Sequence, residues 1–239
     1  MVIGVIGAMD EEIALLLDEM GEVTEEEYAG TTYHRGRLED VSVVLCKSGV
    51  GKVNAAVSTQ VLIDQYQVDA VIFTGVAGAL HPDLDIGDIV ISTECQQHDV
   101  DASPLGFAPG EIPFQETSVF QADPHLVALA EEASEKASGG KTMKGKILSG
   151  DQFISDTERV RKLHERFGGM CVEMEGAAVA HVCHLNRVPF VILRSISDRA
   201  DHSAHVNFTR FTKMASRRSA GIVRRMLAEL RQKGLSPKS

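Results

Sequence analysis

The sequence lacks three features, and each absence argues against a class of protein. Its formal net charge of −10 over 239 residues leaves no basic excess for binding nucleic-acid phosphates. No apolar run approaches the roughly 18 residues that a membrane-spanning helix needs. The opening stretch MVIGVIGAMDEE has no basic segment and turns acidic at Asp10, which is not typical of a signal peptide. We therefore expect a protein without membrane or nucleic-acid partners.

Cysteine is also scarce. The chain has four cysteines: Cys46, Cys95, Cys171 and Cys183. They form no CxxC pair, and three of them lie in apolar runs. Such cysteines behave as small buried hydrophobic residues rather than as disulfides or metal ligands. The pattern favours a reducing compartment, so we expect a cytoplasmic location.

Glycine and alternating apolar segments indicate the fold. The chain has 21 glycines, 5% aromatic, 44% hydrophobic and 24% charged residues, which is ordinary for a soluble α/β protein. Apolar strand-like runs alternate with amphipathic helices, and this predicts one α/β domain: three α/β/α layers around a mixed, mostly parallel central sheet. We expect the domain to span residues 1–232, followed by a flexible tail at 233–239.

Two boundary predictions are specific. Asp10 is expected to cap a helix over residues 10–20, and Asp123 with Pro124 should begin another. The polar segment at 94–121 is too long for an ordinary connection, which favours a functional or interface loop.

Some segments resemble phosphate-binding or metal-binding motifs but lack residues that those motifs require. GGKTMKGKI has glycines and a lysine at phosphate-loop spacing, but Ile147 stands where Ser or Thr should hold magnesium. The i,i+3 histidine pairs, His181 with His184 and His202 with His205, lack the accompanying carboxylates of zinc enzymes. No metal site is predicted.

Acidic residues at the ends of strands are the better candidates. Ligands in such folds bind beyond the carboxyl ends of the strands. Taken singly, Glu11 or Glu12 could serve the helix dipole, Asp198 could cap a turn, and Glu175 could cap a helix. Only one of Glu11 and Glu12 can face the crevice, because consecutive helical residues point about 100° apart. In VEMEGAAVAHVCHL, Glu173 and Glu175 should share a face if the strand continues that far.

Together these segments resemble a known family. GAMDEE, TGVAGAL, GDQFIS, VEMEGAAVAHVCH and RSISDRAD occur in the order found in bacterial 5′-methylthioadenosine/S-adenosylhomocysteine nucleosidases, and the resemblance extends from Met1 to about Leu230. It implies an N-glycosyl hydrolase that releases adenine without metal or cofactor. Its expected substrates are 5′-methylthioadenosine, S-adenosylhomocysteine and 5′-deoxyadenosine, in methionine salvage and by-product recycling.

The resemblance also implies residue roles. Glu12 should activate water, Asp198 should protonate purine N7, and Glu175 should hold the ribose hydroxyls. Other residues are expected around the nucleoside, either in contact with it or close behind: Met9, Val50, Gly78, Phe153, Ile154, Val172, Glu173, Met174, Arg194, Ser197 and Phe208. Whether Glu173 itself touches ligand is left open.

The family forms dimers in which the long loop reaches the neighbouring site. The resemblance therefore places Ala102, Leu105 and Pro113 in the partner's pocket wall. This chain departs from the family at Val76, where serine is common, and at Leu105, where an aromatic is expected. A smaller Leu105 could alter tolerance for the 5′ substituent.

Three rival functions remain. A purine nucleoside phosphorylase would need arginines around a phosphate, whereas GAMDEE places carboxylates there. A futalosine or AMP nucleosidase would share the hydrolytic chemistry. A non-catalytic nucleoside-binding protein should have lost at least one of the three acids.

Overall fold

The computed structural model describes residues 1–137, 140–200 and 204–233, apart from the side chains of residues 205 and 206. His202, the side chain of His205 and residues 234–239 of the predicted tail lie outside the described residues. The described helices and strands follow one another in this order: β1 (Val2–Gly7), α1 (Asp10–Glu19), β2 (Gly21–Tyr28), β3 (Thr31–Leu38), β4 (Val41–Lys47), α2 (Lys52–Tyr66), β5 (Ala70–Ala79), β6 (Ile89–Gln97), the 3₁₀ turn η1 (Ser103–Leu105), β7 (Val119–Gln121), α3 (Pro124–Glu135), β8 (Thr142–Ser149), α4 (Thr157–Phe167), β9 (Gly169–Glu173), α5 (Gly176–Asn186), β10 (Phe190–Asp198) and α6 (Ala204–Lys233).

The strands form one mixed sheet, as predicted for an α/β chain. Strands β4, β1, β5 and β10 are parallel neighbours, and the hairpin of β2 and β3 extends the sheet beyond β4. On the other side, β10 pairs with β6, β6 with β8, β8 with β9, and β9 with β5. These five strands therefore close into a ring, which the alternating sequence pattern did not predict.

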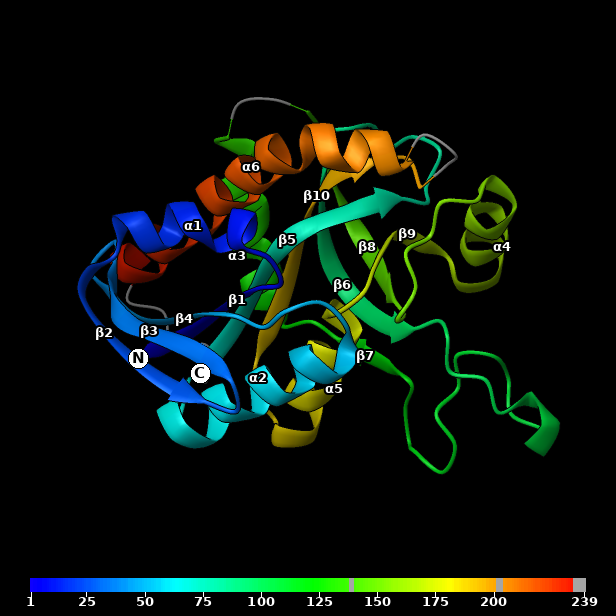
Figure 1. Cartoon of the computed structure of the whole chain (residues 1–239), viewed down its shortest axis with the longest axis horizontal. Coiled ribbons are helices and arrows are strands. Elements are labelled where there is room, and N and C mark those ends of the chain that lie inside the picture. The colour runs from blue at the N-terminus through cyan, green and yellow to red at the C-terminus, as the bar shows by residue number, and fades with distance from the viewer. Residues whose placement is uncertain (138–139, 201–203, 234–239) are drawn as a thin grey trace.

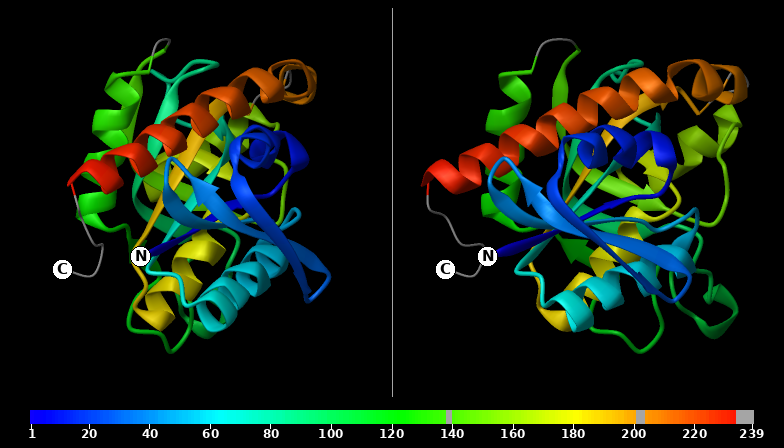
Figure 2. Two further views of the ribbon diagram at one scale, coloured as in Figure 1. Left: turned by 90° about the vertical axis from the view of Figure 1, so that its left-hand side faces the viewer. Right: turned by 60° about the vertical axis from the view of Figure 1, so that its left-hand side comes forward.

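Helices cover both faces of the sheet (Figure 1). On one face, α6 contacts both α1 and α3, and on the other face α2 and α5 contact each other (Figure 2). The period-2 alternation of the strands serves both layers, since successive side chains point to opposite faces. In β1, Ile3 and Val5 pack toward the first group, while Ile6 packs toward the second.

Two local features differ from the expectation from sequence: the start of α1 and the presence of β2. The N-cap of α1 is Met9 rather than Asp10, because Glu12 reaches back and accepts a hydrogen bond from the Met9 backbone N–H. Asp10 instead forms an exposed ion pair with Lys47. The strand β2 was not predicted, because its residues are exposed and acidic rather than apolar.

Other local predictions are confirmed. The Asp123 side chain accepts hydrogen bonds from the backbone N–H groups of His125 and Leu126, with Pro124 in the first turn of α3. All four cysteines are free and buried. None of the helices in the described ranges has the length and apolar character needed to cross a bilayer.

Candidate active site

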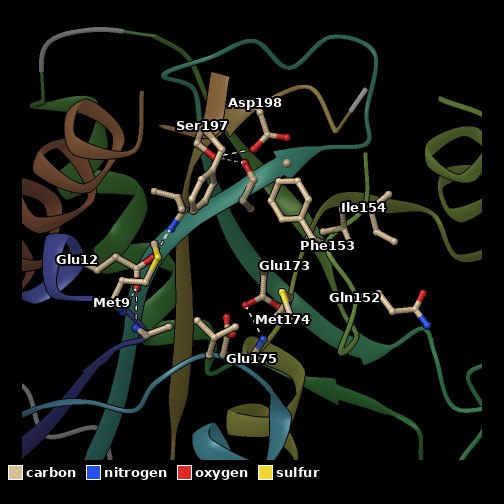
Figure 3. Close-up of a pocket in the computed structure, with 17 residues that line it drawn as sticks. Met9, Glu12, Gln152, Phe153, Ile154, Glu173, Met174, Glu175, Ser197 and Asp198 are labelled. Atoms are coloured by element: carbon tan, nitrogen blue, oxygen red, sulfur yellow. Dashed lines mark hydrogen bonds between the residues drawn. The ribbon is translucent and has the colours of Figure 1, made fainter. Parts of the chain in front are cut away.

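A cavity of about 280 Å³ lies at the carboxyl ends of the central strands (Figure 3). Segments from β1, β5, β9 and β10 meet there with the loops after β4 and β8. Its described lining consists of Ala8, Met9, Glu12, Val50, Val76, Ala77, Gly78, Gln152, Phe153, Ile154, Val172, Glu173, Met174, Glu175, Ser197, Asp198 and Phe208. Residues far apart in the sequence are thus brought together, as the strand-end argument predicted.

Glu12 is the buried carboxylate of the first helical turn. Its Oε2 accepts hydrogen bonds from the backbone N–H groups of Ala8 (2.6 Å) and Met9 (3.0 Å), and its Oε1 accepts one from Val76 (3.0 Å). Burial raises the pKa of Glu12, although Arg194 and these three donors oppose the shift. Glu11 is exposed, so only one of the two neighbouring glutamates faces the cavity, as predicted.

Glu173 and Glu175 make different contacts, a distinction that the sequence left open. Glu173, the last residue of β9, accepts hydrogen bonds from the backbone N–H groups of Glu175 and Gly176 and from the Ser149 hydroxyl. It is therefore Glu173 that satisfies the start of α5, while Glu175 occupies the N-cap position without a capping bond from its side chain. The strand ends before Glu175, so alternation along β9 does not place these two carboxylates.

Glu175 turns instead toward the loop after β4. Its Oε1 accepts a hydrogen bond from the Gly51 backbone N–H at 2.7 Å. Burial, reinforced by the charge of Glu173, raises the pKa of Glu175 to about 8. A carboxyl group in this setting binds a proton readily until a ligand donates hydrogen bonds to it.

Arg194 is the buried cation beneath these acids. Only 1% of it is exposed, its Nη2 donates to Glu173, and its guanidinium lies 4.0 Å from the centroid of the Phe73 ring. Burial alone would lower the pKa of Arg194, but Glu173, Glu12 and Glu175 outweigh it and raise that pKa. Arg194 does not line the cavity, so its position is behind the site, as expected for a supporting group.

Asp198 ends β10 on the opposite wall from Glu175 (Figure 3). Its Oδ2 accepts a hydrogen bond from the Ser197 hydroxyl (2.8 Å), and its Oδ1 accepts one from the Ala200 backbone N–H (2.7 Å). Gly78 makes room for this arrangement, because a Cβ there would lie 2.9 Å from Asp198 Oδ1 and 2.8 Å from the Ala200 Cβ. The turn-capping and pocket-lining readings of Asp198 therefore both hold.

Apolar side chains form the rest of the wall. The rings of Phe153 and Phe208 meet edge to face with centroids 5.7 Å apart, and Ile154 lies beside Phe153 (Figure 3). Met174 lies near Glu175 at the other end of the cavity (Figure 3). An aromatic and aliphatic wall next to four carboxylates suits a ligand with a flat base and a polyhydroxylated ring.

Several supporting residues were not predicted. Ala8, Ala77 and Gln152 line the cavity, although they carry no charge that would single them out. Gly75 is required beneath it, because a Cβ there would lie 2.4 Å from Glu12 Oε1 and 2.5 Å from Arg194 Nη1. Ser149 donates to Glu173 and accepts from the Ala177 backbone N–H. Ser149 is the last residue of β8, and Gly75 interrupts the apolar run of β5; these are the sequence signals that could have indicated them.

The three residues predicted for the partner's pocket are not part of this chain's cavity lining. Ala102, Leu105 and Pro113 belong to the extended segment after β6, which projects from the body of the molecule (Figure 1). Leu105 is 73% exposed and Phe114 is 91% exposed.

The rings of His181 and His184, the i,i+3 pair on α5, both lie against the ring of Phe120. His181 stacks on Phe120 with ring centroids 4.4 Å apart, and its Nδ1 lies within hydrogen-bonding distance of Gln97. Among the described residues, no group of three or more His, Cys, Asp or Glu side chains is arranged to hold a metal ion.

Comparisons with known proteins point to the same chemistry as the geometry. The sequence model of the family described as "Phosphorylase superfamily" matches residues 2–228. A 5′-methylthioadenosine/S-adenosylhomocysteine nucleosidase of Bacillus thuringiensis is 43% identical over 230 residues, covering 96% of this chain and 99% of the relative.

Solved structures are similarly close. The structure of the 5′-methylthioadenosine/S-adenosylhomocysteine nucleosidase from Neisseria meningitidis, in complex with methylthio-immucillin-A, aligns with a TM-score of 0.92 at 40% identity and covers 96% of this chain and 99% of that one. A futalosine hydrolase of Helicobacter pylori aligns with a TM-score of 0.91 at 37% identity, covering 96% and 98%. The fold is therefore shared by hydrolases that are named for different substrates.

Proposed function

The chain belongs to the phosphorylase superfamily and, within it, to the 5′-methylthioadenosine/S-adenosylhomocysteine nucleosidases, and from this premise we propose its reaction. The protein hydrolyses the N-glycosidic bond of 5′-methylthioadenosine and S-adenosylhomocysteine, and of 5′-deoxyadenosine. The products are adenine and the 5-substituted ribose. The observation that supports this best is the convergence of Glu12, Glu175 and Asp198 on one cavity lined by Phe153.

The proposed mechanism assigns one task to each acid. Glu12 takes a proton from a water molecule as the water oxygen bonds to the anomeric carbon. The bond from that carbon to purine N9 breaks, its electron pair passes to the base, and Asp198 delivers a proton to N7. Asp198 must therefore be protonated before the bond breaks, and Glu12 must be ionised to act as the base.

The ribose is held between Glu175 and Met174. The sugar develops positive charge as the bond breaks, so a carboxylate that accepts hydrogen bonds from its hydroxyls stabilises the transition state. In the proposed complex, Phe153 stacks on the base beside Ile154, and Val172 and Met174 form the ribose wall. Gly78 lets the backbone approach the nucleoside, Phe208 covers the pocket, and Met9 adds to the lining. Arg194 and Ser197 support the acids from behind, and Val50 lies at the open end.

A phosphorolytic reaction is disfavoured by the charges. The described residues that line the cavity include four carboxylates and no lysine or arginine. Phosphate recognition favours a guanidinium fork, and the nearby Arg194 is already occupied by Glu173.

The deciding experiment measures adenine release from 5′-methylthioadenosine with and without phosphate. We expect turnover that is independent of phosphate, and phosphate dependence would overturn the hydrolase proposal. A panel containing futalosine and AMP separates this function from the other hydrolases of the fold. Binding without any turnover would instead favour a nucleoside-binding protein.

We further propose that the protein works as a homodimer. The segment after β6 carries Leu105 and Phe114 into solvent, and α2 and α5 add exposed Val53 and Leu185. Apolar side chains at this exposure commonly mark an interface. In the proposed dimer, Ala102, Leu105 and Pro113 complete the neighbour's site near the 5′ substituent. Light scattering coupled to gel filtration should give twice the mass of one chain.

The cellular assignments are also proposals. Four buried, free cysteines fit a reducing cytoplasm. There the reaction would serve methionine salvage and remove by-products of S-adenosylmethionine, with no organic cofactor or metal in the proposed chemistry. Small adenine nucleosides are its expected ligands, and we expect neither nucleic acid nor membrane as a partner.

A further inference from the structure

A second charged cluster lies beside the cavity and belongs to none of the assigned roles. Lys52, the first residue of α2, donates from Nζ to Asp99 Oδ1 at 2.7 Å and to Gln97 Oε1 at 3.1 Å. The side chains of Lys52 and Asp99 are only 19% and 13% exposed. Neither residue lines the catalytic cavity.

This pair joins three separate loops. The Lys52 backbone N–H donates to Asp151 Oδ1 at 2.8 Å, and the Asp151 backbone N–H donates to Asp99 Oδ2 at 2.9 Å. The loop before α2, the end of β6 and the loop after β8 are therefore held by one set of charge-assisted hydrogen bonds. Burial by itself would raise the pKa of Asp99, but these donors outweigh burial and hold that pKa below its ordinary value.

Two of these loops lead directly to residues of the site. Gly51 precedes Lys52 and donates its N–H to Glu175, and it does so with a φ of +100°, a conformation that favours glycine. Asp151 precedes Gln152 and Phe153, which line the cavity. A shift of Lys52 or Asp151 would therefore move the donor to Glu175 and the aromatic ring together.

We propose that the ion pair of Lys52 and Asp99 positions both halves of the nucleoside site, the carboxylate for the ribose and the aromatic wall for the base. The proposal rests on the proposed function and adds two residues to it. Neither residue touches substrate, so both act through Gly51 and the loop at 150–154. A misplacement of about 1 Å in such a site costs roughly 10²-fold in rate.

The test compares Lys52→Met with Lys52→Arg. We expect Lys52→Met to lower kcat/KM for 5′-methylthioadenosine by about 10²-fold, with a higher KM and a lower kcat because both subsites move. Lys52→Arg keeps the charge and should recover most of that loss. Asp99→Asn, which keeps an oxygen for Lys52 but removes the charge, should fall between them.

A pH profile separates positioning from a merely structural role. Loss of the Gly51 hydrogen bond removes a contact that favours the ionised form of Glu175, so the acidic limb of kcat/KM should move to higher pH in Lys52→Met. Amide hydrogen exchange gives a readout that does not depend on turnover. The segments at 48–54 and 150–156 should exchange at least about 10-fold faster in this variant.

Lys144→Met is the matched control, since Lys144 also forms a 2.7 Å ion pair, with Glu131, but at an exposed site on β8. It should change neither exchange nor kcat/KM. Wild-type exchange and an unshifted pH limb in Lys52→Met would overturn the positioning proposal while leaving the hydrolase intact. Absence of turnover in the wild type would overturn the proposed function instead, and the exchange comparison would still decide the positioning role.

Discussion

The inner wall of the cavity and the segment at 98–118 differ in burial. The acids of the inner wall are buried and hydrogen-bonded within one chain, whereas the segment at 98–118 leaves large apolar side chains exposed. On the inner wall, Glu12 and Glu173 are buried and bonded to backbone donors, with Arg194 among them. In the segment at 98–118, Leu105 and Phe114 stand in solvent, and Phe114 adopts a φ of +62° that is uncommon for a bulky residue. The buried carboxylates are thus organised within one chain, whereas Leu105 and Phe114 stay exposed in a single chain and are available for the proposed dimer contact.

The largest effect should come from the inner wall. Asp198→Asn keeps the shape of the side chain but removes the acidic proton, so kcat on 5′-methylthioadenosine should fall by about 10²–10⁴-fold. Steady-state adenine release measures this loss. Thermal unfolding is the control, because the Asn oxygen can still accept from the Ala200 N–H while its NH2 group donates to the Ser197 hydroxyl oxygen. Full activity in this variant would refute the acid assignment.

Removal of the buried cation should cost stability as well as activity. Arg194→Leu leaves Glu173 buried without its ion pair, and breaking such a pair lowers the free energy of unfolding by about 3–5 kcal/mol. Urea denaturation measures the difference. Arg161→Leu, which removes an exposed ion pair with Glu165, should change stability by less than about 1 kcal/mol. Equal effects of the two substitutions would contradict the contrast between buried and exposed regions.

A single methyl group tests the packing under the acids. Gly75→Ala places a Cβ against Glu12 and Arg194 and should cost about 1–3 kcal/mol in overpacking, together with activity. The matched control is Gly21→Ala, where a Cβ meets nothing within 4 Å. Unfolding and turnover of both variants decide the point, and an unaffected Gly75→Ala would show that Glu12 and Arg194 can move without consequence.

The pH dependence of the free energy of unfolding should reveal the raised pKa of Glu175. Burial and the charge of Glu173 raise the pKa of Glu175 from its ordinary value near 4.5 to about 8 in the folded protein. Because the folded state then binds the proton more tightly than the unfolded chain, the contribution of Glu175 is fully present below pH 4.5 and is lost as the pH rises through 8. Glu175→Gln should therefore gain stability relative to the wild type between pH 5 and 8. Parallel urea midpoints across that range would exclude the shift.

The smallest effect is expected in the long segment. Leu105→Phe should change the ratio of kcat/KM for 5′-methylthioadenosine to that for S-adenosylhomocysteine by about 5–10-fold, which corresponds to about 1 kcal/mol, the lower end of what one group in an apolar pocket contributes. Phosphate-independent adenine release from both substrates gives the ratio. The proposed role of Leu105 in the partner's site would be abandoned if the ratio stayed constant in a dimeric variant.

Most elements of the fold were predictable from local pattern. Buried runs such as VIGVIG in β1 and FVILRSISD in β10 carry a clear strand signal, because a strand covered on both faces needs nearly continuous apolar residues. The strand β2 was missed, since an exposed acidic edge carries no such signal. Closure of β5, β10, β6, β8 and β9 into a ring was also missed, because pairing between distant strands is not recorded in the pattern of any one of them.

The site was predictable in its members but not in their contacts. Strand ends and the family resemblance identified Glu12, Glu175 and Asp198, and the structure brings all three to one cavity. Gly75 and Lys52 were not identified, because their importance depends on atoms contributed by segments far away in the sequence.

The sequence by itself determined which acids stand at the ends of strands, because strand and helix periodicity depends on neighbouring residues. Only the tertiary structure decided what each acid contacts. In VEMEG, two glutamates of the same chemistry differ because Glu173 meets Arg194 and the start of α5, while Glu175 meets Gly51 and the cavity. Protonation and hydrogen bonding follow from burial and from the charges nearby, and those are supplied by segments that meet only in the folded chain.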